Sequence, residues 1–198
     1  MSYTIAIVGR PNVGKSTLFN RLLEQRKAIV DDVSGVTRDR QYGVADWSGK
    51  VFNLIDTGGF VPNGTELFEA EIRQQVNIAV EEADALIFLV DVATGITDLD
   101  AAMAHILRKT SKPVFLVVNK VDNGTRELEA TEFYGLGFEN TFFISSISGS
   151  GTGELLDALV ADIGHEDDAE REKLPRITIV GRPNVGKSSF LIALMGEE

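Results

Sequence analysis

A glycine-rich segment near the N-terminus has the spacing of a phosphate-binding loop. Residues 9–16 read G-R-P-N-V-G-K-S and fit the pattern G-x-x-x-x-G-K-[ST] at every fixed position. The two glycines allow backbone N–H groups to approach phosphate oxygens, Lys15 brings a full positive charge, and Ser16 supplies a hydroxyl for Mg²⁺. The residues expected to contact the phosphates are Gly9, Asn12, Val13, Gly14, Lys15, Ser16 and Thr17.

A second motif, Asp56-Thr57-Gly58-Gly59, follows an apolar run and carries groups suited to a metal-bound phosphate. Asp56 could hold a metal-bound water, and Gly58 or Gly59 could present a backbone N–H to a γ-phosphate. Taken alone, the same four residues could equally form only a turn. The assignment of Asp56 as a metal-binding residue therefore depends on the other motifs.

The third motif, Asn119-Lys120-Val121-Asp122, favours one nucleotide base over another. The Asp122 carboxylate fits the paired donors at N1 and N2 of guanine and repels the pattern of adenine, and the aliphatic stem of Lys120 can cover a base face. A phosphate loop alone does not separate GTPases from ATPases or kinases. We therefore expect Asn119 and Asp122 to read guanine, which disfavours an ATPase or a nucleoside kinase.

The elements that must position these motifs alternate between strands and helices. Apolar runs predict buried strands at residues 5–8, 86–91, 114–118 and 141–144, and an alternating pair at 42–47 and 51–55 predicts a hairpin. Apolar residues at helical spacing predict helices after the first loop and at residues 66–83, 98–108, 127–134 and 154–163. Residues 25–40 lack sustained periodicity and are expected to form a loop.

This alternation predicts a three-layer α/β P-loop NTPase fold, with a mostly parallel sheet and one antiparallel edge strand. Ligands of such sheets bind at the carboxyl ends of the strands, and all three motifs fall at such ends. The three motifs are therefore expected to form one site.

An internal repeat suggests more than one domain. Residues 181–188 are identical to residues 9–16 and again follow an apolar run. We predict a GTPase domain at residues 1–163, an acidic linker at 164–175 and the truncated start of a second GTPase domain at 176–198. About 20 residues are too few to bury a core of their own, so the chain is expected to be part of a longer parent.

Together these motifs, with Gly35-Val36-Thr37-Arg38-Asp39, resemble the Era-like, translation-factor-related GTPases, and the duplicated loop resembles their tandem-domain Der (EngA) family. The resemblance implies that Thr37 closes on Mg²⁺ and the γ-phosphate. It also implies that Ser145 and Ser146 contact the base, although members of the family usually carry Ser-Ala there. It further implies a role in large ribosomal subunit assembly, with the subunit as partner of the full-length parent.

The resemblance also bears on catalysis. Many small GTPases have a Gln directly after the D-x-x-G motif to orient water, whereas this chain has Phe60, which cannot accept a hydrogen bond. In related GTPases an asparagine at the position of Asn12 ligates a monovalent cation, so K⁺ could neutralise the developing charge here. Alternatively, Asn12 only braces its loop. The expected catalytic residues are Asn12, Lys15, Thr37 and Gly59, and the expected metal ligands are Ser16, Thr37 and Asp56.

Composition and charge restrict the class of protein further. The net charge of −11 and pI of about 4.7 are the opposite of a nucleic-acid-binding surface, so we expect no direct nucleic-acid footprint. With no Cys, no long apolar run and no signal peptide, we expect a cytoplasmic protein without a membrane partner. The leading hypothesis is a GTP-hydrolysing switch that uses GTP/GDP and Mg²⁺. The alternative is a binding module gated by GTP, in which hydrolysis is incidental.

Overall fold

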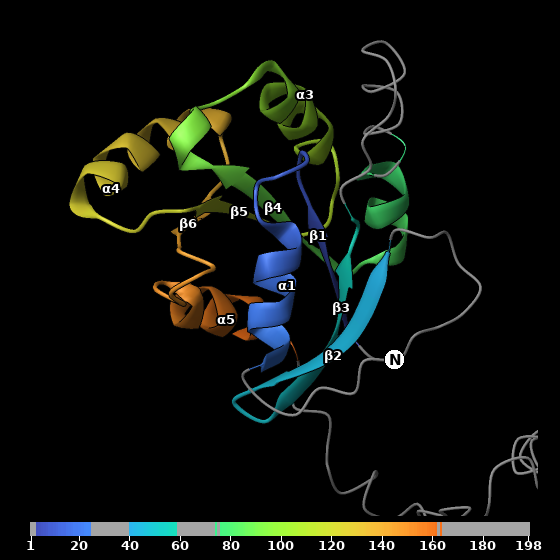
Figure 1. Ribbon diagram of the computed structural model, residues 1–198. Helices are drawn as coiled ribbons and strands as arrows, with labels where there is room; N and C mark the ends of the chain where they lie inside the picture. Colours follow the sequence, from blue (N-terminus) through green and yellow to red (C-terminus); the bar gives the residue numbers. More distant parts are fainter. Residues whose placement is uncertain (1–2, 25–39, 59–73, 75, 162, 164–198) are drawn as a thin grey trace, which may run out of the picture. The chain divides into compact units, whose positions relative to one another are not determined.

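The computed structural model describes residues 3–24, 40–58, 74, 76–161 and 163 (Figure 1). The chain divides into two units, Met1–Gly164 and His165–Glu198, and the described residues belong to the first. The predicted linker and second glycine-rich loop lie outside the described residues, as do Thr37, Gly59 and residues 25–39 of the predicted loop.

A six-stranded sheet in the order β2-β3-β1-β4-β5-β6 organises this unit (Figure 1). Every neighbouring pair is parallel except β2 and β3. The strands are β1 (Thr4–Val8), β2 (Gln41–Trp47), β3 (Lys50–Asp56), β4 (Ala85–Asp91), β5 (Val114–Asn119) and β6 (Asn140–Phe143). The predicted parallel sheet with one antiparallel edge strand is confirmed.

The hairpin that forms this edge turns at Ser48 and Gly49. Both residues have positive φ, 52° and 78°, and Trp47 pairs with Lys50, which together define a two-residue type I′ turn. At its turn end the hairpin is tied to a helix, because the Trp47 indole donates to Asp157 and the Lys50 ammonium donates to the Val160 carbonyl.

Helices cover both faces of the sheet and complete three layers. The helices are α1 (Lys15–Glu24), α3 (Asp98–Leu107), α4 (Gly124–Ala130) and α5 (Thr152–Ala161), with 3₁₀ turns η1 (Val92–Thr94) and η2 (Thr131–Leu136), and residues 76–82 are also helical. On one face, α1 and α5 pack through Leu18, Phe19 and Leu156 against alternate residues of the strands. On the other face, the helical residues 76–82 pack together with α3 and η2.

Two predicted helices had wrong boundaries. Residues 127–134 were predicted as one helix, but α4 begins at Gly124 and gives way to the 3₁₀ turn η2 after Ala130. Asn123 caps the helix by accepting a hydrogen bond from the Arg126 N–H, which explains the early start. The last helix begins at Thr152 rather than Glu154, directly after a tight turn at Gly151 with φ of 74°.

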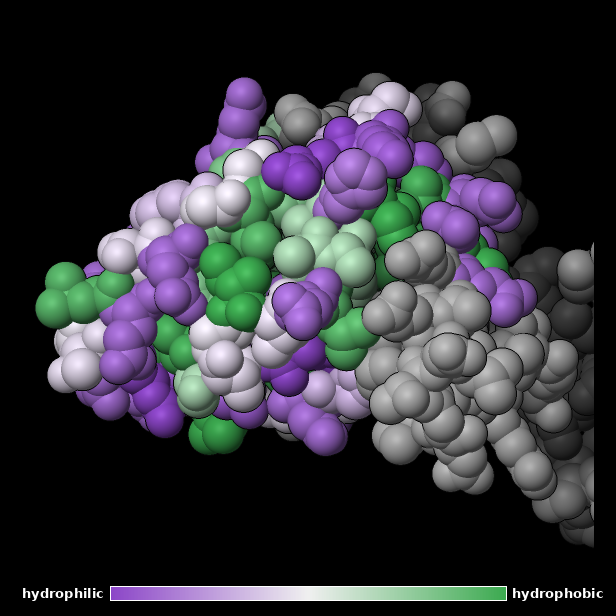
Figure 2. Space-filling model, turned by 90° about the horizontal axis from the view of Figure 1, so that it is seen from above, coloured by the Kyte–Doolittle hydropathy of each residue, from purple (hydrophilic) through white to green (hydrophobic). Residues whose placement is uncertain are grey.

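Large exposed hydrophobic residues are spread over the described part of the chain. On the described part of the face in Figure 2, hydrophobic residues lie in separate groups between hydrophilic ones. The large exposed hydrophobic residues come from different elements and are Val44, Ile96, Leu128, Tyr134 and Ile147. None of the described helices has the length and apolarity needed to cross a membrane.

Candidate functional site

The site lies where four strands end. The carboxyl ends of β1, β3, β4 and β5 carry Val8, Asp56, Asp91 and Asn119, and strand register places Asp56 beside Ile7 and Asp91 beside Asn119. Because these strands are parallel, the loops that follow them meet at one edge of the sheet. The sheet therefore brings the described parts of the three predicted motifs together.

The glycine-rich loop needs its glycines because other groups approach closely. A Cβ atom on Gly9 would lie 2.4 Å from the Leu89 carbonyl oxygen. A Cβ atom on Gly14, whose φ is 100°, would lie 2.4 Å from Nδ2 of Asn119. Asn12 also takes a left-handed conformation, with φ of 66°, and its side chain is exposed. The loop thus packs tightly against β4 and β5 while Asn12 faces outward.

Lys15 is buried at the start of α1 and held by its own loop. Its ammonium donates to the carbonyls of Gly9 and Arg10, both at 2.9 Å. These are its hydrogen-bond partners among the described residues, which leaves one of its three N–H donors for a phosphate oxygen. Burial lowers the pKa of Lys15 from 10.5 to about 8, although the Asp56 carboxylate raises it in part and the Arg10 guanidinium lowers it further.

The second motif is fixed to β1 at its Thr residue. The Thr57 hydroxyl donates to the Ile7 carbonyl at 2.8 Å, and the Gly58 N–H donates to Oδ1 of Asp56 at 3.0 Å. Asp56 is 1% exposed and close enough to Lys15 to act on its charge. The structure therefore places a buried carboxylate close to the lysine of the glycine-rich loop, whereas Gly59 lies outside the described residues.

Asn119 joins the glycine-rich loop to the turn after β6. Its amide Nδ2 donates to the Val13 carbonyl at 2.8 Å. Its Oδ1 accepts two hydrogen bonds of 2.9 Å, from the backbone N–H and the hydroxyl of Ser146. Asn119 is 2% exposed, and its amide is already hydrogen-bonded to the Val13 carbonyl and to the N–H and hydroxyl of Ser146. In this structure Asn119 therefore braces the glycine-rich loop against the turn after β6. Ser145, likewise buried, closes the turn by accepting from the Gly149 N–H.

Lys120 and Asp122 lie further out. The Lys120 ammonium pairs with Asp91 and also donates to the Asn12 carbonyl at 3.3 Å. The Asp122 carboxylate, 53% exposed, is engaged by Arg126 at 3.1 Å and by Asn123 at 3.0 Å. Exposed pairs of this kind contribute about 1 kcal/mol or less, so a better partner can displace them.

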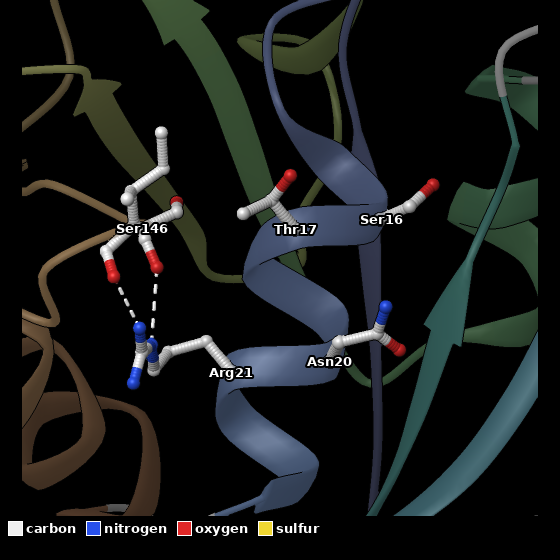
Figure 3. A pocket seen from close by; sticks show the side chains of 6 residues that line it. Ser16, Thr17, Asn20, Arg21 and Ser146 are labelled. Atoms are coloured by element: carbon white, nitrogen blue, oxygen red, sulfur yellow. Dashed lines mark hydrogen bonds between the residues drawn. The ribbon is translucent and has the colours of Figure 1, made fainter.

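A cavity of about 400 Å³ opens between α1 and the turn after β6 (Figure 3). Thr17 and Arg21 lie on the side of α1 nearer Ser146, and the Arg21 guanidinium donates to the carbonyls of Ser146 and Ile147. The volume suits a small organic ligand. The lining residues are Ser16, Thr17, Asn20, Arg21, Ser146 and Ile147, three of which the sequence had already singled out.

Several charged residues at this edge were missed by the sequence analysis. Arg10 pairs with the fully buried Asp100 of α3 at 3.3 Å and also donates to the Thr94 hydroxyl, which fastens the glycine-rich loop to α3. Asp91 and Arg21 were missed as well. Asp91 could have been found, because it stands at the end of an apolar strand as Asp56 does, but Arg21 looks like any helix-surface residue.

The donors present suit Mg²⁺. Ser16 is exposed at the first turn of α1, and the Asp56 carboxylate lies close to the same helix start. Among the described residues no group of three or more His, Cys, Asp or Glu side chains could hold a metal ion. Mg²⁺ commonly takes only one or two protein oxygens and completes its shell with phosphates and waters, so a hydroxyl with one carboxylate is sufficient.

Comparisons with known proteins agree with these motifs. Residues 4–120 and 176–198 match the family described as 50S ribosome-binding GTPase. The chain is 57% identical to GTPase Der of Christiangramia forsetii, over 100% of this chain and 46% of the relative. It is 58% identical to GTPase Der of Flavobacterium johnsoniae, over 98% and 45%. The chain therefore spans about half the length of the curated relatives it matches.

Solved structures share the fold. Era of Aquifex aeolicus bound to GDP and AlF₄⁻ has a TM-score of 0.63 and 26% identity, over 93% of this chain and 61% of that chain. Era in complex with MgGDPNP and part of 16S ribosomal RNA has the same TM-score and identity, over 93% and 60%. The G domain of T. maritima FeoB has a TM-score of 0.59 and 27% identity, over 81% and 98%.

Proposed function

Because the chain belongs to the 50S ribosome-binding GTPase family, we propose that it is a molecular switch that binds GTP and hydrolyses it to GDP and phosphate. The observation that carries this proposal is the position of Asn119, which contacts both the glycine-rich loop and the turn at Ser146. The Asn119 side chain thereby fixes the glycine-rich loop, which would hold the phosphates, relative to the turn at Ser146, which would contact the base.

Each described residue has a defined part in this proposal. Lys15 and the backbone N–H groups of its loop hold the phosphates, and their positive charge stabilises negative charge that develops during hydrolysis. Ser16 and Asp56, together with Thr37, hold Mg²⁺, which screens the phosphate charge when bound. Asp122 exchanges Arg126 and Asn123 for the two donors on the guanine edge.

Base reading can be tested with an Asp122→Asn variant. The amide can donate to the extra oxygen of xanthine, whereas the carboxylate of Asp122 repels it. We expect GTP affinity to fall by up to about 10⁴-fold and xanthosine triphosphate binding to improve. GTP and ATP titrations of the unaltered chain are the companion measurement. Guanine reading by Asp122 is refuted if the variant binds GTP as tightly as the unaltered chain.

K⁺ is the proposed aid to hydrolysis, held by Asn12 near the phosphates. Among the described residues the Asn12 side chain forms no hydrogen bond, and Asn12 is exposed, which supports a role in holding a cation over the alternative that it braces the loop. Gly59, whose backbone N–H would contact the γ-phosphate, and Thr37 complete the proposed catalytic set.

Large ribosomal subunit assembly is the proposed setting, reached through a longer parent protein in the cytoplasm. The family description supports it, and so does Era, a neighbour in fold that was solved with ribosomal RNA. A GTP-gated binding module with incidental hydrolysis is the second candidate, favoured by the missing water-orienting Gln. Single-turnover hydrolysis with and without 50S particles separates the two, since a module would bind particles in a nucleotide-dependent way without faster hydrolysis.

A further inference from the structure

We propose that Asp91 is a positioning residue for nucleotide binding, because its carboxylate fixes the Lys120 side chain beside the glycine-rich loop. This inference rests on the proposed function and deepens it. None of the three sequence motifs contains Asp91, which is the last residue of β4. The strand register places it directly beside Asn119, and therefore next to Lys120.

The two oxygens of Asp91 have separate tasks. Oδ1 accepts a hydrogen bond of 2.9 Å from the Ala93 N–H and caps η1. Oδ2 accepts the Lys120 ammonium at 2.5 Å. The Asp91 side chain is 4% exposed and the Lys120 side chain 37% exposed. The acid is thus fixed within the fold, and the lysine is the half-exposed partner that it holds.

The contact with Asp91 is the shorter of the two hydrogen bonds that the Lys120 ammonium forms among the described residues. The other, of 3.3 Å, is to the Asn12 carbonyl. A lysine has a flexible four-carbon stem, and ordering that stem when a base binds opposes binding. Asp91 orders the stem beforehand, so that the base meets a surface already in place.

An Asp91→Asn variant isolates this role. The amide oxygen can still accept the Ala93 N–H and keep the cap, but its NH₂ group cannot accept the ammonium. We expect the KM for GTP and the Kd for GDP to rise between about twofold and tenfold, which corresponds to ordering one long side chain. The kcat at saturating GTP should not change, because the Asp91 carboxylate contacts Ala93 and Lys120 and not Lys15 or Asp56.

Lys120→Met supplies the decisive comparison. If Asp91 acts through Lys120, Asp91→Asn should have no further effect on GDP affinity once the ammonium is gone. Asp98→Asn, an exposed acid in the first turn of α3, is the matched charge control and should leave KM and Kd unchanged. If Asp91→Asn does not fold, Asp91→Ser keeps a capping oxygen and removes the carboxylate.

The outcomes are distinct. A raised KM with unchanged kcat, absent in the Lys120→Met background, supports the proposal. An unchanged KM in Asp91→Asn overturns it, and so does a rise of the same size with and without Lys120, because the effect would then not pass through the lysine. Failure of the unaltered chain to bind GTP or GDP would instead overturn the proposed function.

Discussion

Nucleotide binding should take up a proton near pH 8, because burial lowers the pKa of Lys15 to about 8. Phosphate oxygens favour the charged ammonium, so Lys15 should stay protonated through pH 9 once a nucleotide is bound. The free chain has lost about 0.1 of the Lys15 proton at pH 7, about 0.5 at pH 8 and about 0.9 at pH 9. Binding must restore these fractions, and apparent affinity should fall about tenfold between pH 7 and pH 9.

Calorimetry of GDP binding in two buffers of different ionisation enthalpy measures this uptake directly. At pH 8 the observed enthalpies should differ by about half the difference between the buffer enthalpies. The diphosphate is already fully ionised at pH 8, so it does not contribute. Equal enthalpies in both buffers at pH 8 would refute the assignment of Lys15 as the titrating group.

The same pKa has a consequence for stability. In the unfolded chain Lys15 keeps its proton up to pH 10.5, while the folded chain loses it near pH 8, so the unfolded state binds more protons between these values. The free energy of unfolding should therefore rise with pH across this window, by about 3 kcal/mol at most. Lys15→Met should abolish the rise in urea titrations, and a persistent rise in that variant would assign it to another group.

Three further predictions follow from named contacts. GTP turnover should be severalfold faster in K⁺ than in Na⁺ at matched ionic strength, and Asn12→Ala should remove the difference while leaving GDP affinity nearly intact; equal initial rates in both salts would contradict the K⁺ site. Asn119→Ala should lower the free energy of unfolding by about 2–4 kcal/mol, because buried partners at Val13 and Ser146 lose their hydrogen bonds. Ser146→Ala should lower it by less than about 1 kcal/mol. Similar urea midpoints for the two variants would refute the role of Asn119 as a brace. Arg10→Ala should cost about 3 kcal/mol because Asp100 is left buried without its cation, and a change below 1 kcal/mol in the same titration would show that the pair is dispensable.

The parallel strands β1, β4 and β5 could be predicted from the sequence because each contains an uninterrupted apolar run. Residues 86–91 and 115–118 are buried, so their composition alone indicates parallel strands under helices. The hairpin was equally accessible, since Ser-Gly between two alternating runs is a turn signal. Helix ends were harder, because Asn123 stops one pattern and caps the next helix, and a single polar side chain decides the boundary.

Motif spacing in the sequence was enough to choose candidate site residues, but not to predict the contacts between them. Gly14 and Asn119 lie 105 positions apart in the chain, and both could be assigned from local patterns alone. Their close approach could not be predicted, because no local pattern reports the register of β4 against β1 or of β5 against β4. The contacts of Arg10 with Asp100 and of Arg21 with Ser146 could not be predicted either, because each forms only when the helices pack against the sheet.

The contact between Gly14 and Asn119 limits how freely the nucleotide preference of this fold can be redesigned. A Cβ on Gly14 would collide with the Asn119 amide, and that amide is itself held by the Val13 carbonyl and by Ser146. A substitution of Asn119 that is meant to change base preference therefore also disturbs the glycine-rich loop. In a library of variants, substitutions tolerated at one of the two positions should depend on the residue at the other. If Asp122 reads guanine as proposed, a change of base preference can be made there alone, because its partners among the described residues are Arg126 and Asn123.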